Sequence, residues 1–149
     1  MTTLFFILVG LQGFVSIATI VARLSGRTET YRVMPRWMRR LLGAYAGITL
    51  YPLGIYVLPE VISRWDAPTA RRIRLHEAIH ARQQSEMLGL FFLWYAAEYL
   101  VRRMFADHRD AYRGISLEAE AYANDGDAGY LDRREPFAWE AYLGRRTCE

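Results

Sequence analysis

Two histidines and a glutamate stand at a spacing suited to metal chemistry in L-HEAIH-ARQQS-E, residues 75–86. His76 and His80 are four residues apart, so on a helix both imidazoles project from one face, with Glu77 beside them. Zinc binds imidazole nitrogen, and a catalytic zinc site uses three protein ligands and leaves the fourth position for water. The pattern predicts a zinc site with a carboxylate base, and a helix with two surface histidines is the alternative.

The third ligand is expected in a polar stretch nearer the C-terminus. Ser116 can start a short helix, SLEAEAYAND, which carries Glu118 and Glu120. Residues two apart on a helix point about 200° away from each other, so both carboxylates cannot face one ion. We prefer Glu118, because Ala121 lies on its face and lets the motif helix approach. Glu120 is the alternative third ligand, and His108 is a more distant candidate.

A long helix is expected to position the two histidines. Asp66 or Thr69 could cap it, and we expect it to run from residue 69 or 70 to about Phe105. Beyond Glu86 the segment from Met87 to Ala97 is apolar on all sides and too short to span a membrane, so a buried core or the membrane interface is expected. Its aromatic side chains are expected to pack rather than bind substrate: Phe91, Phe92, Trp94 and Tyr95.

Strands rather than a second spanning helix are expected over residues 41–58. The stretch is long enough to span, but glycines and Pro52 interrupt it and its β-branched and aromatic residues favour strand. A second crossing would also put the basic cluster at residues 64–74 on the side opposite to that favoured by the charge bias. We therefore predict a mainly α protein with a small β element, whose edge could bind an extended substrate as an added strand.

Residues 4–22 form a run of nineteen residues without a charge, long enough to cross the hydrocarbon layer as a helix. We predict a membrane anchor, with a cleaved signal peptide or a buried core helix as alternatives. Residues 23–40 carry six arginines against one acid, and such an excess is usually cytoplasmic. The chain is expected to be a single-pass protein of a bacterial inner membrane, with its bulk cytoplasmic. Residues 1–40 then form the anchor and basic juxtamembrane segment, and residues 41–149 the metal-binding domain.

The composition is that of a folded chain with a modest basic charge. Of 149 residues 52% are hydrophobic and 14% aromatic, which excludes a disordered chain. All nineteen basic residues are arginine and the net charge is +3, which suits an anionic membrane surface, and no nucleic-acid motif accompanies it. The single cysteine, Cys148, excludes an internal disulfide. Membrane lipid is the expected partner, and the sequence leaves the oligomeric state open.

HEAIH followed 38 residues later by Glu118, in E-A-E-A-Y, resembles the gluzincin clan of zinc metallopeptidases, whose third ligand is a glutamate on a second helix. The motifs are most similar to integral-membrane members, the prenyl-protein and heat-shock membrane proteases, in which that glutamate begins an E-x-x-A-D pattern. Residues 82–84 and 118–122 also resemble small uncharacterised bacterial membrane proteins of peptidase type. The resemblance covers roughly residues 45–125.

The chain departs from this pattern in two places. Tyr122 stands where the aspartate that usually supports a ligand histidine would be, and the chain has far fewer membrane spans than those proteases. The acidic run N-D-G-D at residues 124–127 lacks the distal glutamate of a calcium loop and is expected to be a turn.

The resemblance implies a minimal zincin-like core made of an edge strand, the HExxH helix and the helix with the third ligand. In it His76, His80 and Glu118 would bind Zn²⁺, and Glu77 would be the general base to zinc-bound water. Three side chains are candidates to stabilise the oxyanion: His108, Tyr112 and Tyr122. The implied function is a membrane-anchored zinc-dependent hydrolase, a metallopeptidase acting on a peptide or protein substrate.

Two other functions compete with this one. The chain could be a non-catalytic membrane protein that binds zinc for structure or sensing, or a membrane or partner-binding protein with a chance motif. Glu77 favours the hydrolase, because a structural zinc site needs no carboxylate at the base position and is normally closed by four protein ligands.

Overall fold

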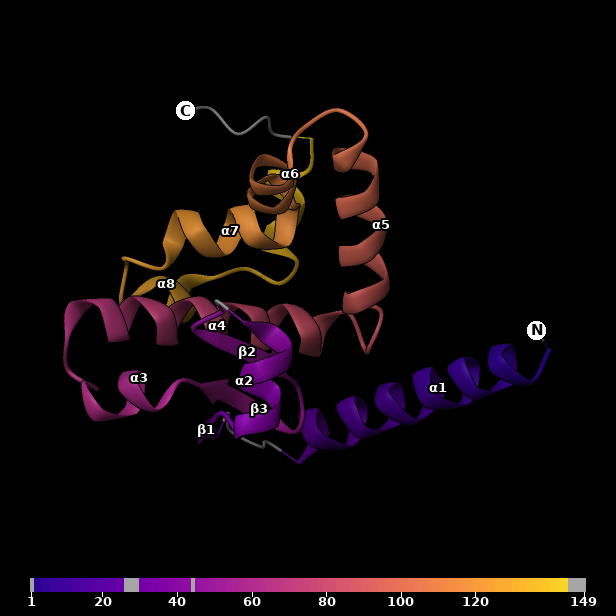
Figure 1. The fold of residues 1–149 in the computed structure, drawn as a ribbon, viewed down its shortest axis with the longest axis horizontal. Coiled ribbons are helices and arrows are strands. Elements are labelled where there is room, and N and C mark those ends of the chain that lie inside the picture. The colour runs from indigo at the N-terminus through magenta and orange to yellow at the C-terminus, as the bar shows by residue number, and fades with distance from the viewer. Residues whose placement is uncertain (1, 26–29, 44, 145–149) are drawn as a thin grey trace.

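The computed structural model describes residues 2–25, 30–43 and 45–144, with side chains from Gly13 onwards (Figure 1). The elements in chain order are α1 (Thr2–Leu24), β1 (Tyr31–Val33), α2 (Arg36–Leu42), β2 (Gly47–Leu50), β3 (Gly54–Val57), α3 (Pro59–Ser63), α4 (Pro68–Glu86), α5 (Phe91–Arg103), α6 (His108–Gly114), α7 (Ser116–Asn124), α8 (Tyr130–Arg133) and the 3₁₀ helix η1 (Ala138–Tyr142). The predicted fold class, mainly α with a small β element, is confirmed.

Three short strands form the sheet, in the order β1-β3-β2. β1 pairs with β3 in parallel, with Val33 opposite Val57, and β2 pairs with β3 in an antiparallel hairpin. Both hairpin strands lie within residues 41–58, so the prediction of strands there is confirmed. Gly54 opens β3 at φ 135°, where a Cβ would meet the carbonyl oxygen of Thr30 at 2.9 Å, so the position requires glycine.

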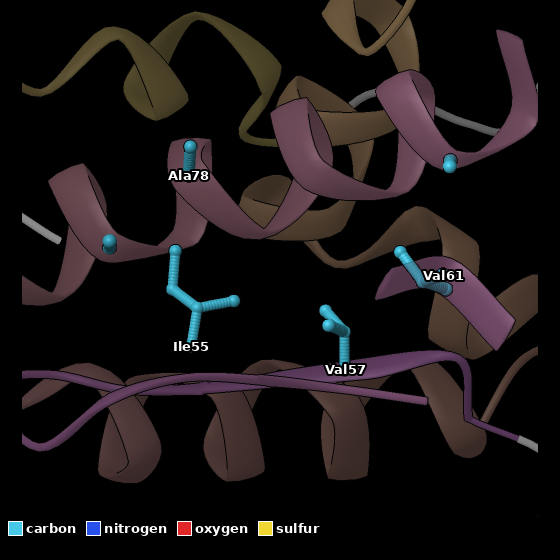
Figure 2. Packing of buried hydrophobic residues seen from close by; sticks show 6 residues of the cluster. Ile55, Val57, Val61 and Ala78 are labelled. Atoms are coloured by element: carbon cyan, nitrogen blue, oxygen red, sulfur yellow. The ribbon is translucent and has the colours of Figure 1, made fainter. Parts of the chain in front are cut away.

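The core lies between the sheet and α4, which Figure 1 shows between the sheet and α7. Ile55 and Val57 of β3 point toward α4, and Val61 of α3 closes one end of the cluster (Figure 2). α4 faces them with small side chains, Ala70, Ala78 and Ala81, which let the helix approach the sheet closely. A second cluster lies away from the sheet and consists of Phe91, Ile115, Leu117 and Trp139.

The expectation of one helix from residue 69 or 70 to about Phe105 is wrong, because α4 and α5 are separate helices. Leu88 and Gly89 between them have φ values of 49° and 91°, which an α-helix cannot accommodate. Gly89 is the helix-ending signal that the apolar run concealed. The predicted start of this helix, residue 69 or 70, is close to the observed start of α4 at Pro68. Pro68 occupies a first-turn position, where its missing N–H costs no hydrogen bond.

α1 contains the run 4–22 for which the sequence predicts an anchor. It leaves the body of the molecule at the sheet (Figure 1), and the hydroxyl of Ser16 donates to the carbonyl oxygen of Leu88 at 2.6 Å. Among the residues that the structure describes, no helix is long and apolar enough to cross a membrane. The structure therefore does not support the transmembrane helix, which stays a prediction.

Two paired valines test where the core lies. Val57 is fully buried and Val33, opposite it on β1, is 53% exposed. Val57→Ala should lower the free energy of unfolding by about 2 kcal/mol, because it removes buried methyl groups and leaves a cavity. The matched Val33→Ala should change it by less than about 0.5 kcal/mol in the same urea titration. Equal effects of the two substitutions would contradict this placement of the core.

Candidate metal centre

α4 and α7 bring three of the predicted site residues together. His76 and His80 lie one turn apart on α4, and Glu118 lies in the first turn of α7, which packs across α4. Nε2 of His80 is 3.1 Å from Nε2 of His76, and each nitrogen is 3.4 Å from an oxygen of Glu118. Atoms bound to a tetrahedral zinc at about 2.0–2.1 Å would lie about 3.3–3.4 Å apart. The two 3.4 Å spacings involve different oxygens of Glu118, and one ligand atom from each residue lies within 4.8 Å of the others, which is compatible with a shared ion.

One oxygen of Glu118 is left without a hydrogen bond. Glu118 is 3% exposed, and its Oε2 atom has no hydrogen-bond partner among the described residues. Its Oε1 atom accepts a hydrogen bond from the hydroxyl of Tyr95 at 2.9 Å. A buried carboxylate oxygen without a partner is costly, and a cation between Glu118 and the two imidazoles would satisfy it. The donor set therefore fits a metal ion.

The charges of this group are strongly coupled. Burial acts to raise the pKa of Glu118, but the positive charges on His80 and His76 outweigh it and hold this pKa well below its usual range. Burial acts to lower the pKa of His80, but the negative charge and hydrogen bonding of Glu118 raise it to about 9. Without a metal, the cluster therefore holds a proton on His80 beside the ionised Glu118. A bound cation would take the place of that proton.

Glu77 lies on the side of α4 that faces β2. It is 7% exposed, and the Thr49 hydroxyl lies 2.8 Å from both its Oε2 atom and its backbone carbonyl oxygen. Burial raises the pKa of Glu77 above its usual value, although the neighbouring imidazolium charges and the hydrogen bond from Thr49 oppose the shift. A carboxylate with a raised pKa is suited to accept and return a proton near neutral pH.

Gln83 fixes the orientation of His80. Its side-chain NH₂ group donates to the carbonyl oxygen of Leu117 and to Glu120, both at 3.0 Å. Its amide oxygen therefore faces Nδ1 of His80, at 2.7 Å, and accepts a hydrogen bond from it. This arrangement places the neutral imidazole's proton on Nδ1 and leaves the Nε2 lone pair directed at the site. Gln83 follows His80 by three residues, so helical spacing places the two side chains on one face, but the sequence does not show that Leu117 and Glu120 orient the amide.

Asp125 is the acidic neighbour of the other histidine. Its Oδ2 atom is 3.8 Å from Nδ1 of His76, and its Oδ1 atom accepts two hydrogen bonds from Arg72, at 2.7 and 3.0 Å. Tyr122, at the position expected for such an aspartate, instead packs its ring 4.7 Å from the His76 ring.

The sequence does indicate this position for Asp125. It follows Glu118 by seven residues, or two helical turns, and so lies on the same face. The turn expected at residues 124–127 is also present, with the backbone N–H of Asp127 donating to the carbonyl oxygen of Asn124 at 3.0 Å.

Glu120, the alternative third ligand, has a different set of contacts. It is fully buried and accepts hydrogen bonds from Nε of Arg134 at 2.5 Å and from the Tyr130 hydroxyl at 2.9 Å, besides the one from Gln83. Arg134 also pairs with Glu86 at the end of α4. Burial acts to lower the pKa of Arg134, but its hydrogen bonds to these two glutamates raise it above its ordinary value. Glu120 therefore belongs to a buried ion-pair network rather than to the histidine cluster.

A cavity of about 550 Å³ opens beside the histidines and Glu118. Its wall includes residues 46–49 at β2, aromatic side chains of α5, and two of the predicted oxyanion stabilisers, Tyr112 and Tyr122. The third candidate, His108, is not among the described residues that line it and instead packs edge-on against Tyr99, at 5.9 Å. The cavity provides space for a substrate next to the candidate ligands.

No family model matches the chain, and comparisons with curated proteins and with solved structures found no match. The resemblance to gluzincins therefore continues to rest on the motif residues and on the geometry they adopt.

Gly47 offers a test of the contact between β2 and Glu77. A Cβ at this position would lie 2.6 Å from Oε1 of Glu77 and 2.8 Å from its Cγ and Cδ atoms. Gly47→Ala should displace Glu77 from Thr49 and lower the free energy of unfolding by about 1–3 kcal/mol, the usual cost of overpacking. Gly126→Ala is the control, because a Cβ there meets nothing within 4 Å. Equal stability of both variants in urea unfolding would contradict the close contact.

Proposed function

We propose that this protein is a zinc-dependent hydrolase, and specifically a metallopeptidase, in which His76, His80 and Glu118 hold the metal and Glu77 is the general base. The observation that carries the proposal is the convergence of these three residues, whose candidate ligand atoms lie within 4.8 Å of one another around a buried carboxylate oxygen that makes no hydrogen bond. Two imidazoles and one carboxylate are the donor set of catalytic zinc sites that keep a position open.

Zinc, when bound, would supply Lewis-acid polarisation of a carbonyl and acidify water in its vicinity. Glu77 would carry out the proton transfers. Its buried carboxylate, positioned by Thr49, would take a proton from the attacking water and then give it to the leaving amine. The raised pKa assists the first transfer, because it makes the carboxylate a stronger base.

Two tyrosines in the cavity wall support the negative charge that develops on the carbonyl oxygen. Burial raises the pKa of Tyr112 and of Tyr122, so both hydroxyls keep their protons at neutral pH and can donate hydrogen bonds. Tyr95 has a different task, since its hydroxyl already donates to Glu118. It holds that carboxylate in place.

The edge of β2 favours a peptide as the substrate, because part of this strand could pair with a peptide backbone. The side-chain amide of Gln84 accepts a hydrogen bond from the backbone N–H of Tyr51 and donates one to the carbonyl oxygen of Thr49, each at 2.8 Å. Gln84 thus makes the contacts that a neighbouring strand would make at that end. The Gly47 end of the strand lines the cavity, and we propose that it pairs with the substrate backbone.

We also propose that residues 4–22 attach the chain to a membrane, with the remainder on the cytoplasmic side. The support is the uncharged run itself and the excess of arginine that follows it.

Metal affinity tests the ligand set. Purified protein should bind one zinc ion per chain in competition with a chromogenic chelator, and His76→Ala or His80→Ala should abolish that binding. Glu118→Gln should weaken it by more than the 10–100-fold typical of residues that only support a ligand. Glu140→Gln, at an exposed position, is the matched control. If Glu120→Gln weakens binding most, the third ligand is wrongly assigned.

Hydrolysis tests the role of Glu77. Glu77→Gln should keep zinc affinity and lose about 10²–10⁴-fold in turnover of a quenched-fluorescent peptide library that the wild-type protein cleaves. Wild-type turnover in this variant would assign the base elsewhere. Zinc binding by a wild-type protein that cleaves no member of the library would favour a structural or sensing site over a peptidase.

A further inference from the structure

Glu120 lies outside the proposed metal centre and is surrounded by hydrogen-bond donors. Its side chain is fully buried. Its Oε1 atom accepts hydrogen bonds from Nε of Arg134 at 2.5 Å and from the Tyr130 hydroxyl at 2.9 Å. Its Oε2 atom accepts from the side-chain NH₂ group of Gln83 at 3.0 Å and from Nη2 of Arg134 at 3.3 Å. Both oxygens of this carboxylate therefore accept two hydrogen bonds each.

Arg134 determines the direction of these hydrogen bonds. Its side chain is 3% exposed, and a guanidinium carries N–H donors and no acceptor. A group that faces it must therefore accept, which an ionised carboxylate does with both oxygens. Arg134 also pairs with Glu86 at the end of α4, so its guanidinium is held from two sides.

Gln83 transmits this direction to His80. A carboxylate oxygen only accepts, so the NH₂ group of the Gln83 amide must be the end that faces Glu120. The carbonyl oxygen of Leu117, at 3.0 Å from the same nitrogen, favours the same orientation. The amide oxygen is then the atom that lies 2.7 Å from Nδ1 of His80, and it needs a proton on that nitrogen.

We propose that Arg134 and Glu120 are positioning residues that keep the proton of the neutral His80 ring on Nδ1, and so keep Nε2 free to bind a metal. The importance of Nε2 rests on the metal site of the proposed function, but not on hydrolysis. The other tautomer carries its proton on Nε2. That nitrogen lies 3.4 Å from Oε1 of Glu118, so the proton would occupy the space that the metal needs.

Glu120→Gln should reverse this series of hydrogen bonds. The substitution keeps the shape of the side chain but replaces one acceptor oxygen by an NH₂ donor. This NH₂ group would meet another donor if it faced Nε of Arg134, so it should face Gln83. Gln83 would then turn its oxygen toward position 120 and its own NH₂ group toward His80. Nδ1 would have to accept a hydrogen bond, and the ring proton would reside on Nε2.

NMR of the full chain with isotope-labelled histidine, recorded without metal, tests where the proton lies. Long-range correlations from the carbon-bound ring protons show which ring nitrogen is protonated. Nδ1 of His80 should be protonated in the wild-type protein and in Glu140→Gln, an exposed control, but not in Glu120→Gln. The double variant Glu120→Gln/Arg134→Gln should regain the proton on Nδ1. Its amide at position 134 can accept from the amide at position 120 and still donate to Glu86.

Zinc affinity, measured in competition with a chromogenic chelator, tests the consequence for the metal. Glu120→Gln should weaken zinc binding by about 10–100-fold, the range typical of residues that support a ligand, and by less than Glu118→Gln does. The double variant should recover most of the wild-type affinity. If Glu120 only stabilised the fold, the second substitution would instead weaken zinc binding further.

Two results would overturn the proposal. A protonated Nδ1 and wild-type zinc affinity in a folded Glu120→Gln variant would show that Glu120 does not select the tautomer. An unprotonated Nδ1 of His80 in the wild-type protein would refute the proposal without any variant, even if Glu120→Gln failed to fold. The spectra need no metal, so they test His80 separately from the proposed hydrolase, which the absence of zinc binding by the wild-type protein would refute.

Discussion

The candidate site depends on how two carboxylates are buried between α4 and α7. Glu118 and Glu120 are two residues apart and both lie out of water, so each needs its own compensation. Arg134 compensates the charge of Glu120 and also pairs with Glu86. These two ion pairs connect the C-terminal segment to both helices. With Glu120 held on that side, helix geometry turns Glu118 toward the histidines. The position of Glu118, the proposed third ligand, therefore follows from an ion pair outside the proposed site.

The residues of the site that lie on one helix face could be predicted from sequence, and those that meet across elements could not. Helical periodicity alone places His76 and His80 on one face, whereas the preference for Glu118 also rests on the E-x-x-A pattern of the resembled proteases. Thr49 acts through a contact between elements distant in the chain. Gln83 lies three residues from His80 on α4, but its amide is oriented by Leu117 and Glu120 of α7, which the sequence does not indicate. Helical periodicity also places Asp125 on the face of Glu118, but its neighbours in the sequence are typical of a turn.

The fold, too, could be predicted from the sequence only in part. Glycines and a proline in residues 41–58 indicated strands correctly, because they are incompatible with a long helix. The break before α5 was missed, since Gly89 is a single signal within an apolar run and Leu88 adopts a positive φ that its residue type disfavours. The segment from Met87 to Ala97 was expected to be apolar on all sides. Glu98 and Arg102 follow it, and only the packing shows that they turn inward.

The break between α4 and α5 also has a mechanical consequence. α4 and α5 are separate helices joined at Leu88 and Gly89, so a displacement of α5 need not bend the helix that carries the histidines. Across that joint, the hydroxyl of Tyr95 reaches the carboxylate of Glu118 at 2.9 Å. A displacement of α5 would therefore act on Glu118 through Tyr95 before it reached His76 and His80, which lie on α4.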